Sequence, residues 1–164
     1  MSSTPYLLRV LLIAIFTVAS VASAESPAKK PPVGIPADAT LFNGKWYYVY
    51  LQKIGWKASK VKCERLGGQL AVIHDEATWA FIKTLKPGVQ LWLGASDEQL
   101  EGNWVWVDGK PFTFKSWGRG QPDNARVEEH YLMMGWNGEN WNDAAESGGK
   151  VIQVQGFICE WRDK

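Results

Sequence analysis

The sequence predicts an α+β domain, and three observations favour this fold class. Two segments in the first half of the chain repeat apolar residues at helical spacing. The second half contains short runs of aromatic and β-branched residues, which are typical of strands. Turn-forming residues such as Gly and Asp separate these runs. Two early helices followed by several strands indicate an α+β domain in which the strands pair antiparallel.

The first 24 residues predict a cleaved signal peptide. Arg9 is the only charged residue before Glu25, and it precedes an apolar run over residues 10–16. Residues 22–24 then give the small-x-small pattern that signal peptidase accepts. An uncleaved membrane anchor is the alternative, although a full span needs about 20 apolar residues. Cleavage predicts a secreted, extracellular protein (periplasmic in a bacterium) with no stable insertion in a membrane.

Residues 25–39 predict a Pro/Lys-rich linker to the folded domain, which we place at residues 40–164. The segment contains four prolines and two adjacent lysines and has no apolar periodicity. Proline removes a backbone donor and stiffens the chain, so such a segment favours a tether over a helix or strand.

Two helices are expected, over residues 56–66 and 75–85. The inward face of the first comprises Trp56, Ser59, Cys63 and Leu66. Gly67 and Gly68 end this helix. Asp75 caps the second helix, and the Pro87–Gly88 pair stops it. The inward face of the second comprises Ala77, Phe81, Ile82 and Leu85.

Five segments before and after the two helices have the composition of strands. They are residues 46–50, 91–93, 104–107, 131–134 and 157–159. Asp108 and Gly109 form a turn signal after the third of them. The core is expected to include Trp92, Leu93, Phe157 and Ile158.

Composition and motifs exclude several classes of protein. The chain has 18 Lys and Arg against 17 Asp and Glu, which argues against a nucleic-acid binder. It lacks the Gly-x-Ser-x-Gly, His-Glu-x-x-His and phosphate-loop motifs of common enzymes. Ten tryptophans are many for 164 residues, and such rings serve either in a core or on sugar-binding and interface surfaces.

Residues 115–142 have little regular pattern and concentrate side chains with oxygen atoms. With Asp143, which directly follows the segment, these residues are Gln121, Asp123, Asn124, Glu128, Glu129, Asn137, Asn140, Asn142 and Asp143. One interpretation is that Asn, Asp and Gly simply form turns. The other is a hard-cation site, because calcium takes 6–8 oxygen ligands in proteins.

The order of several motifs resembles the C-type lectin-like domain family over most of the chain from Lys45 to Arg162. The first set comprises Trp56 and Cys63, the segment 67–73 and Leu91-Trp92-Leu93-Gly94. The second comprises Gln121-Pro122-Asp123, Trp141-Asn142-Asp143 and Phe157-Ile158-Cys159-Glu160. Each motif alone is weak, and together in this order they make a strong signal.

The resemblance implies a calcium site with a role in carbohydrate binding. The implied ligands are Gln121, Asp123, Glu129, Asn142 and Asp143, with a cis peptide bond between Gln121 and Pro122. Two vicinal sugar hydroxyls would complete the calcium shell and donate hydrogen bonds to the carboxylates. The resemblance therefore implies a non-enzymatic protein that binds glycans or glycoconjugates through Ca²⁺.

A second calcium position is also implied, from acids that precede the Gln-Pro-Asp triplet. Its ligands would be Asp97, Glu101, Asn124 and Glu129. His130 stands where the family commonly has an acid, and imidazole is a poor partner for calcium. An exposed turn over residues 97–102 is the alternative.

The two cysteines, Cys63 and Cys159, match the outer disulfide of the family. A secreted chain with an even number of cysteines favours oxidation. Two buried free thiols are the alternative. The inner disulfide of most animal members is absent, with Tyr131 and Glu146 near the positions where its cysteines would stand.

The triplet Gln-Pro-Asp usually accompanies galactose-type ligands in this family, whereas Glu-Pro-Asn accompanies mannose-type ones. Galactose sites usually also have an aromatic residue close behind the triplet, and residues 124–128 contain none. Trp117 or Trp136 could substitute, although both also suit a core. A glycosidase would need two carboxylates beside the bond, but the resemblance assigns these acids to calcium. A protein-interaction module of the same fold, with calcium structural or absent, is the alternative function.

Overall fold

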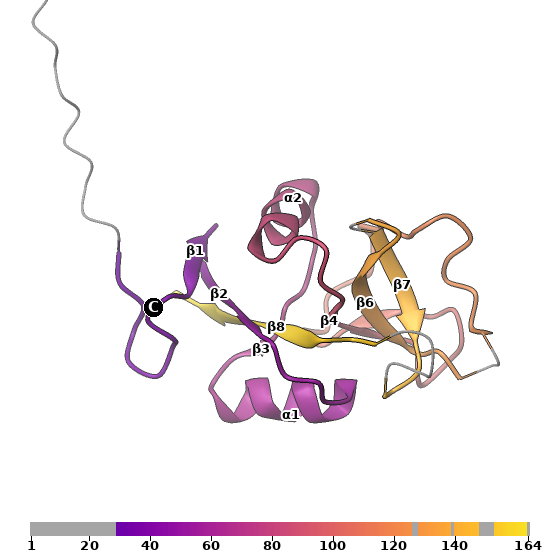
Figure 1. Ribbon diagram of the computed structural model, residues 1–164, viewed down its shortest axis with the longest axis horizontal. Helices are drawn as coiled ribbons and strands as arrows, with labels where there is room; N and C mark the ends of the chain where they lie inside the picture. Colours follow the sequence, from indigo (N-terminus) through magenta and orange to yellow (C-terminus); the bar gives the residue numbers. More distant parts are fainter. Residues whose placement is uncertain (1–28, 126–127, 139, 148–152, 164) are drawn as a thin grey trace, which may run out of the picture.

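A computed structural model describes residues 29–125, 128–138, 140–147 and 153–163 (Figure 1). The predicted signal peptide at residues 1–24 and the start of the linker lie outside the described residues. No helix within the described residues is long and apolar enough to cross a membrane.

The described chain forms two helices and eight strands. The helices are α1 (Trp56–Arg65) and α2 (Glu76–Leu85). The strands are β1 (Thr40–Phe42), β2 (Lys45–Tyr50), β3 (Gln69–Leu70), β4 (Leu91–Ser96), β5 (Val105–Trp106), β6 (Tyr131–Trp136), β7 (Asn140–Ala144) and β8 (Gly156–Arg162). This composition confirms the α+β class. The predicted strands are present, whereas β1, β3 and β7 were not predicted.

The strands form one mixed sheet in the order β1-β2-β8-β4-β6-β7, with β3 paired to β8 and β5 paired to β4. β8 is antiparallel to β2 but parallel to β4. The expectation of purely antiparallel pairing is therefore wrong at this position. Because β2 and β4 run in opposite directions, a strand inserted between them must be parallel to one of them.

The two faces of the sheet bury separate apolar clusters, because successive side chains of a strand point to opposite sides. In β8, Phe157 and Cys159 join one cluster while Ile158 joins the other. α1 covers the first cluster and α2 the second, so the helices lie on opposite sides of β2 and β8 (Figure 1). The expected core residues Trp92 and Leu93 are fully buried, as are Phe157 and Ile158.

Helix α1 matches its predicted face and end. Trp56, Ser59 and Cys63 are buried. The helix ends where Gly67 adopts a positive φ of 75°, which lets the N–H of Gly68 reach the carbonyl of Cys63.

Helix α2 begins and ends as predicted, and Phe81, Ile82 and Leu85 of its predicted face pack against the core. Thr78, Trp79 and Ile82 are buried, whereas Ala77 is exposed. The Trp79 ring packs edge-on against Trp141 at 5.5 Å. A large ring that finds an aromatic partner buries more area than an alanine, so packing against Trp141 sets the face.

The segment 115–142, expected to be irregular, contains a hairpin in its second half. β6 and β7 pair antiparallel, with Leu132 opposite Asp143. Asn137 and Gly138 both have positive φ at the turn between them. Asn142 and Asp143 therefore lie on a strand, and the irregular part ends before Tyr131.

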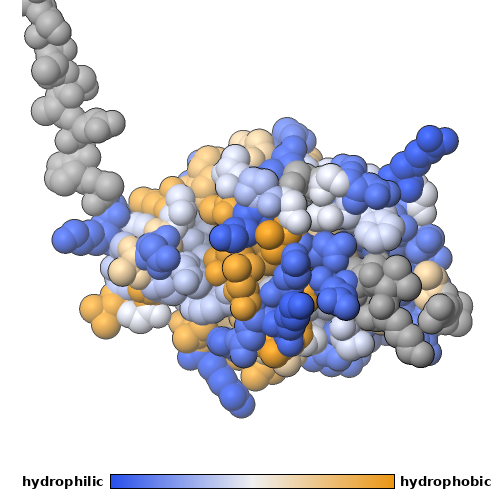
Figure 2. Space-filling view, in the orientation of Figure 1, coloured by the Kyte–Doolittle hydropathy of each residue, from blue (hydrophilic) through white to orange (hydrophobic). Residues whose placement is uncertain are grey.

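The described part of the linker is not a free tether. Ala39 is buried and Ile35 packs against the α1-side cluster. Lys29 forms an ion pair with Asp163 near the other end of the chain. On the face in Figure 2, small hydrophobic patches alternate with hydrophilic side chains.

Candidate metal and ligand site

Strand β7 supplies the rigid half of the candidate site. Trp141 is fully buried, and its backbone N–H donates to the carbonyl of Ser116 at 2.9 Å. Its own carbonyl accepts from the N–H of Gly118 at 2.8 Å. These bonds tie the preceding loop to β7. The next two residues, Asn142 and Asp143, are 1% and 0% exposed.

The loop before β6 supplies the other half and turns sharply at Pro122. The Gln121–Pro122 peptide bond is cis, as the sequence predicted. After this turn, the Asp143 carboxylate accepts the backbone N–H groups of Asp123 and Asn124 at 3.1 and 2.7 Å. One buried carboxylate on β7 thus fixes the loop that follows the proline.

Three carboxylates converge where loop and strand meet. Oxygens of Asp123, Glu129 and Asp143 all lie within 4.8 Å of one another. Burial raises the pKa of Asp143, while the N–H groups of Asn124 and Asp123 lower it and the charge of Asp123 raises it further. A cation would stabilise this concentration of negative charge.

Two amide oxygens from the same segments lack hydrogen-bond partners within the described residues. They are Oε1 of Gln121 and Oδ1 of Asn142, and both atoms are buried. A buried amide oxygen normally finds a donor, so each unpaired one needs an explanation. A hard cation accepts such carbonyl oxygens as ligands together with carboxylates. The residues present therefore fit a calcium ion.

A second group of ligand atoms comprises Asp97, Glu101 and His130, whose candidate ligand atoms also lie within 4.8 Å of one another. Nδ1 of His130 is 3.2 Å from Oδ1 of Asp97 and 3.4 Å from Oε2 of Glu101. Asn124 contacts this group, because its side-chain N–H₂ donates to Glu101. Glu129, which the sequence placed in both sets, belongs to the first carboxylate cluster. The sequence analysis left His130 out of this set because imidazole is a poor ligand for calcium.

Cys63 on α1 and Cys159 on β8 are fully buried, and their side chains lie within hydrogen-bonding distance of each other. The disulfide between them stays a prediction. Burial raises the pKa of the Cys159 thiol. The pair has the proximity that a disulfide needs, and whether it forms depends on the oxidation state of the compartment.

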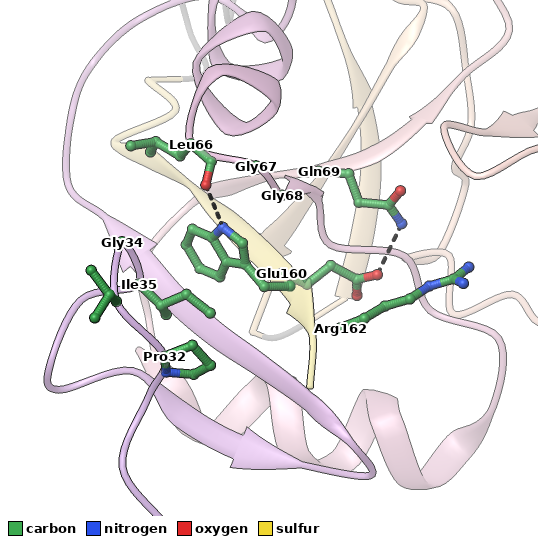
Figure 3. Close-up of a pocket in the computed structure, with 11 residues that line it drawn as sticks. Pro32, Gly34, Ile35, Leu66, Gly67, Gly68, Gln69, Glu160 and Arg162 are labelled. Carbon is green, nitrogen blue, oxygen red and sulfur yellow. Dashed lines mark hydrogen bonds between the residues drawn. The ribbon is translucent and has the colours of Figure 1, made fainter. Parts of the chain in front are cut away.

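A separate pocket of about 500 Å³ lies between residues 32–35 and the end of β8 (Figure 3). Two of its polar side chains are already paired. Glu160 accepts hydrogen bonds from Gln69 and Lys45, and the indole N–H of Trp161 donates to the carbonyl of Leu66. This pairing leaves the oxygen-rich loop as the stronger candidate site.

Comparison with known families matches residues 52–160 to the Lectin C-type domain. The hepatic lectin of Gallus gallus is 34% identical over 106 residues, which are 62% of this chain and 50% of that protein. The galactose-specific lectin nattectin of Thalassophryne nattereri is 27% identical over 149 residues, 88% of this chain and 91% of that protein. The chain thus spans about half the length of the hepatic lectin but most of nattectin.

Solved structures give the same fold. The carbohydrate-recognition domain of the mouse scavenger receptor C-type lectin superimposes with a TM-score of 0.68 at 30% identity, over 79% of this chain and 98% of that chain. Herring type II antifreeze protein superimposes with a TM-score of 0.70 at 26% identity, over 79% of this chain and 100% of that chain. The fold therefore occurs in lectins and in antifreeze proteins.

Proposed function

The chain belongs to the C-type lectin domain family, and on that premise we propose that it binds glycans through a calcium ion. The lectins of this family bind carbohydrates and are not enzymes. The ion would lie where the loop before β6 meets β7. Its ligands would be Gln121, Asp123, Glu129, Asn142 and Asp143.

The observation that carries the proposal is the combination of charged and unpaired oxygens at one junction. Three carboxylates converge there, and two buried amide oxygens from the same segments have no donor within the described residues. Turns alone would explain the Asn and Asp residues but would not require unpaired buried oxygens. Calcium supplies the missing partner for both kinds of oxygen.

The sugar would reach the ion from solvent. Asp123 is exposed and Glu129 is partly exposed, whereas Asn142 and Asp143 are buried behind them. Three carboxylates give three negative charges against the two positive charges of calcium. Two vicinal hydroxyls of a sugar can then complete the calcium shell. The same hydroxyls can donate charge-assisted hydrogen bonds to the carboxylates, which are the strong class.

Galactose-type sugars are the ligand class that we propose. The triplet at residues 121–123 is Gln-Pro-Asp, which resembles the galactose-type pattern. Nattectin, which matches most of this chain, is described as galactose-specific. Trp117, one of two candidates for a sugar-stacking platform, packs against the α2-side cluster and touches Trp141 and Trp104. Trp136, the other candidate, is also half-buried and packs against the α1-side cluster.

We further propose that the mature protein is secreted after loss of residues 1–24 and meets glycoconjugates outside the cell. Several relatives are longer than this chain, so this part of the proposal rests on the N-terminal pattern alone. The second candidate function is a non-sugar interaction module, with calcium structural or absent. The antifreeze proteins of the same fold support it.

The test is retention on galactose and mannose resins in millimolar calcium and in EDTA. We expect retention of the parent protein in calcium on galactose, and release by EDTA or by free galactose. Asp143→Asn keeps the shape of the side chain but removes one charge from the ion, so we expect retention to be lost. Glu128→Gln is the matched control, because Glu128 is an exposed acid in the same loop outside the carboxylate cluster.

Equal retention of Asp143→Asn and the parent would contradict the calcium-bridged mechanism. No retention of the parent on either resin would favour the non-sugar module. Binding to a protein partner that persists in EDTA would do the same.

A further inference from the structure

We propose that Asp97, Glu101 and His130 form a second metal site that takes a borderline transition-metal ion, with Zn²⁺ as the representative, in place of calcium. The backbone brings the three together. β4 ends at Ser96, which pairs with Tyr131 at the start of β6. The flanking residues Asp97 and His130 therefore face each other, and the N–H of Asp97 donates to the carbonyl of His130 at 3.2 Å.

The two distances from the His130 nitrogen to the carboxylates suit a tetrahedral ion. Zinc binds nitrogen and carboxylate oxygen at about 2.0–2.2 Å, so neighbouring ligands of a tetrahedral site lie roughly 3.3–3.5 Å apart. Nδ1 of His130 lies 3.2 Å from Asp97 and 3.4 Å from Glu101. Closure around an ion would thus need only small side-chain movements.

Two carboxylates converge on one ring nitrogen in this cluster, and Oδ1 of Asp97 lies within hydrogen-bonding distance of that nitrogen, Nδ1 of His130. Nδ1 of an imidazole carries at most one hydrogen, yet it faces oxygens of two carboxylates. Asp97 is only 1% exposed, so its charge has little access to water. An ion bound to neutral imidazole and both carboxylates would satisfy all three groups at once.

Neighbouring groups hold the two carboxylates in place, as outer partners do in metal sites. The second oxygen of Asp97, Oδ2, accepts the backbone N–H of Gly102 at 2.8 Å. Glu101 accepts from the side-chain amide of Asn124. The side chains of His130 and Glu101 are 27% and 51% exposed, so water has access as a fourth ligand.

The same contacts make the group unsuited to calcium. Calcium needs 6–8 oxygen ligands, whereas this group offers two carboxylates and a nitrogen. Glu129 lies in the other cluster, and the amide oxygen of Asn124 accepts the backbone N–H of Glu129 at 3.1 Å. Imidazole suits zinc, while calcium prefers carboxylates, carbonyls and water.

The experiment measures zinc binding by equilibrium dialysis of the untagged mature protein against ZnCl₂, with saturating calcium present. We expect one zinc ion per chain. The chain has two histidines, so His74→Gln is the matched control and should bind zinc like the parent. His130→Gln should bind at least about 10-fold more weakly, because losing even an outer partner of a metal ligand costs 10–100-fold.

Two further measurements separate the alternatives. His130→Asp should bind zinc more weakly than the parent, because a third carboxylate replaces the imidazole that suits zinc. In the parent, NMR signals of the His130 ring should shift on addition of zinc while those of His74 do not, which requires no variant at the site. Asp143→Asn should still bind zinc, so the outcome is independent of the proposed sugar site.

Absence of zinc binding by the parent, or equal binding by the parent and His130→Gln, would overturn the proposal. So would ring signals of His130 that do not respond to zinc.

Discussion

At the scale of single residues, Asp143 joins the fold to the candidate site. Its carboxylate is fully buried, which costs free energy unless the charge is compensated. Two backbone N–H groups from the loop compensate part of the charge, and a bound cation would compensate more. The same side chain therefore holds the loop through hydrogen bonds and would also bind the proposed ion.

Asp75 is a residue whose contribution to stability is local enough to measure. Its side chain accepts the N–H of Thr78 at 2.7 Å at the start of α2. We expect Asp75→Ala to lower the free energy of unfolding by about 1 kcal/mol, because it removes a helix N-cap. Asp75→Asn keeps an acceptor and should lose much less. Denaturant unfolding of the three proteins at pH 7 measures both effects.

The pH dependence of this cap has a defined sign. The hydrogen bond from Thr78 lowers the pKa of Asp75 below its ordinary value of 3.8. A depressed pKa stabilises the folded state above the ordinary value, and that stability is lost as the pH falls below it. The stability difference between the parent and Asp75→Ala should therefore shrink below about pH 4. A constant difference down to pH 2 would contradict a role for the charge.

Residue types and motif order were enough to predict the cap at Asp75, the cis Gln121–Pro122 bond and the core residues of β4 and β8. They were not enough to predict which acids share a cluster. Glu129 and His130 are adjacent in sequence yet belong to different groups, because neighbouring residues of an extended chain point in opposite directions. The pairing of Ser96 with Tyr131 decides the group, and that pairing is a tertiary contact.

At the scale of elements, β7 carries both a core tryptophan and the buried half of the candidate site. The Trp141 ring contacts Trp79, Trp106, Phe112, Phe114 and Trp117 at centroid distances of 5.5–5.9 Å. Because Asn142 and Asp143 follow directly, the packing of this ring fixes where their oxygens lie.

Trp141→Ala should lower the free energy of unfolding by about 3–5 kcal/mol, the usual cost of removing a buried aromatic ring. Trp141→Phe should cost less, because the indole N–H of Trp141 has no partner within the described residues. Denaturant unfolding measures both, and calcium affinity of the folded fraction should fall in parallel. Val105→Ala is the control, since Val105 is 45% exposed. Equal losses for Trp141→Ala and Val105→Ala would refute this role of the ring.

Element types were more predictable than strand partners. The composition of β7, Asn-Trp-Asn-Asp-Ala, is dominated by polar residues that disfavour strands. It forms a strand because β6 offers a partner and Trp141 is drawn into the core. A tertiary contact of the same kind buries Trp79 of α2 against Trp141. No local pattern contains this information.

At the scale of the whole molecule, the ends of the domain meet through α1 and β8. The thiols of Cys63 and Cys159 contact each other in the core between them. A disulfide here would close a loop of about 100 residues, which the chain-entropy model values at roughly 4–5 kcal/mol.

We expect protein purified from an oxidising compartment to show no titratable thiol after denaturation. Reduction should then lower the midpoint of denaturant unfolding substantially. Cys63→Ala with Cys159→Ala, which has no thiol to titrate, is the control for the effect of the reductant itself. Two titratable thiols in the denatured protein from that compartment would contradict the disulfide.

Calcium should stabilise the whole domain, although its proposed ligands lie at one end of it (Figure 1). An ion that binds only the folded state raises stability by mass action, by about 2.7 kcal/mol at a concentration 100 times its dissociation constant. The melting temperature should therefore be higher in millimolar calcium than in EDTA. Asp143→Asn should lose this increment and Glu128→Gln should keep it. The proposed ion would link the loop before β6 to β7. Because Trp141 ties β7 to the core, stabilising the contact between this loop and β7 should stabilise the whole domain against unfolding. A melting temperature that is the same in calcium and in EDTA would rule out the principal calcium site while leaving the zinc site to be tested separately.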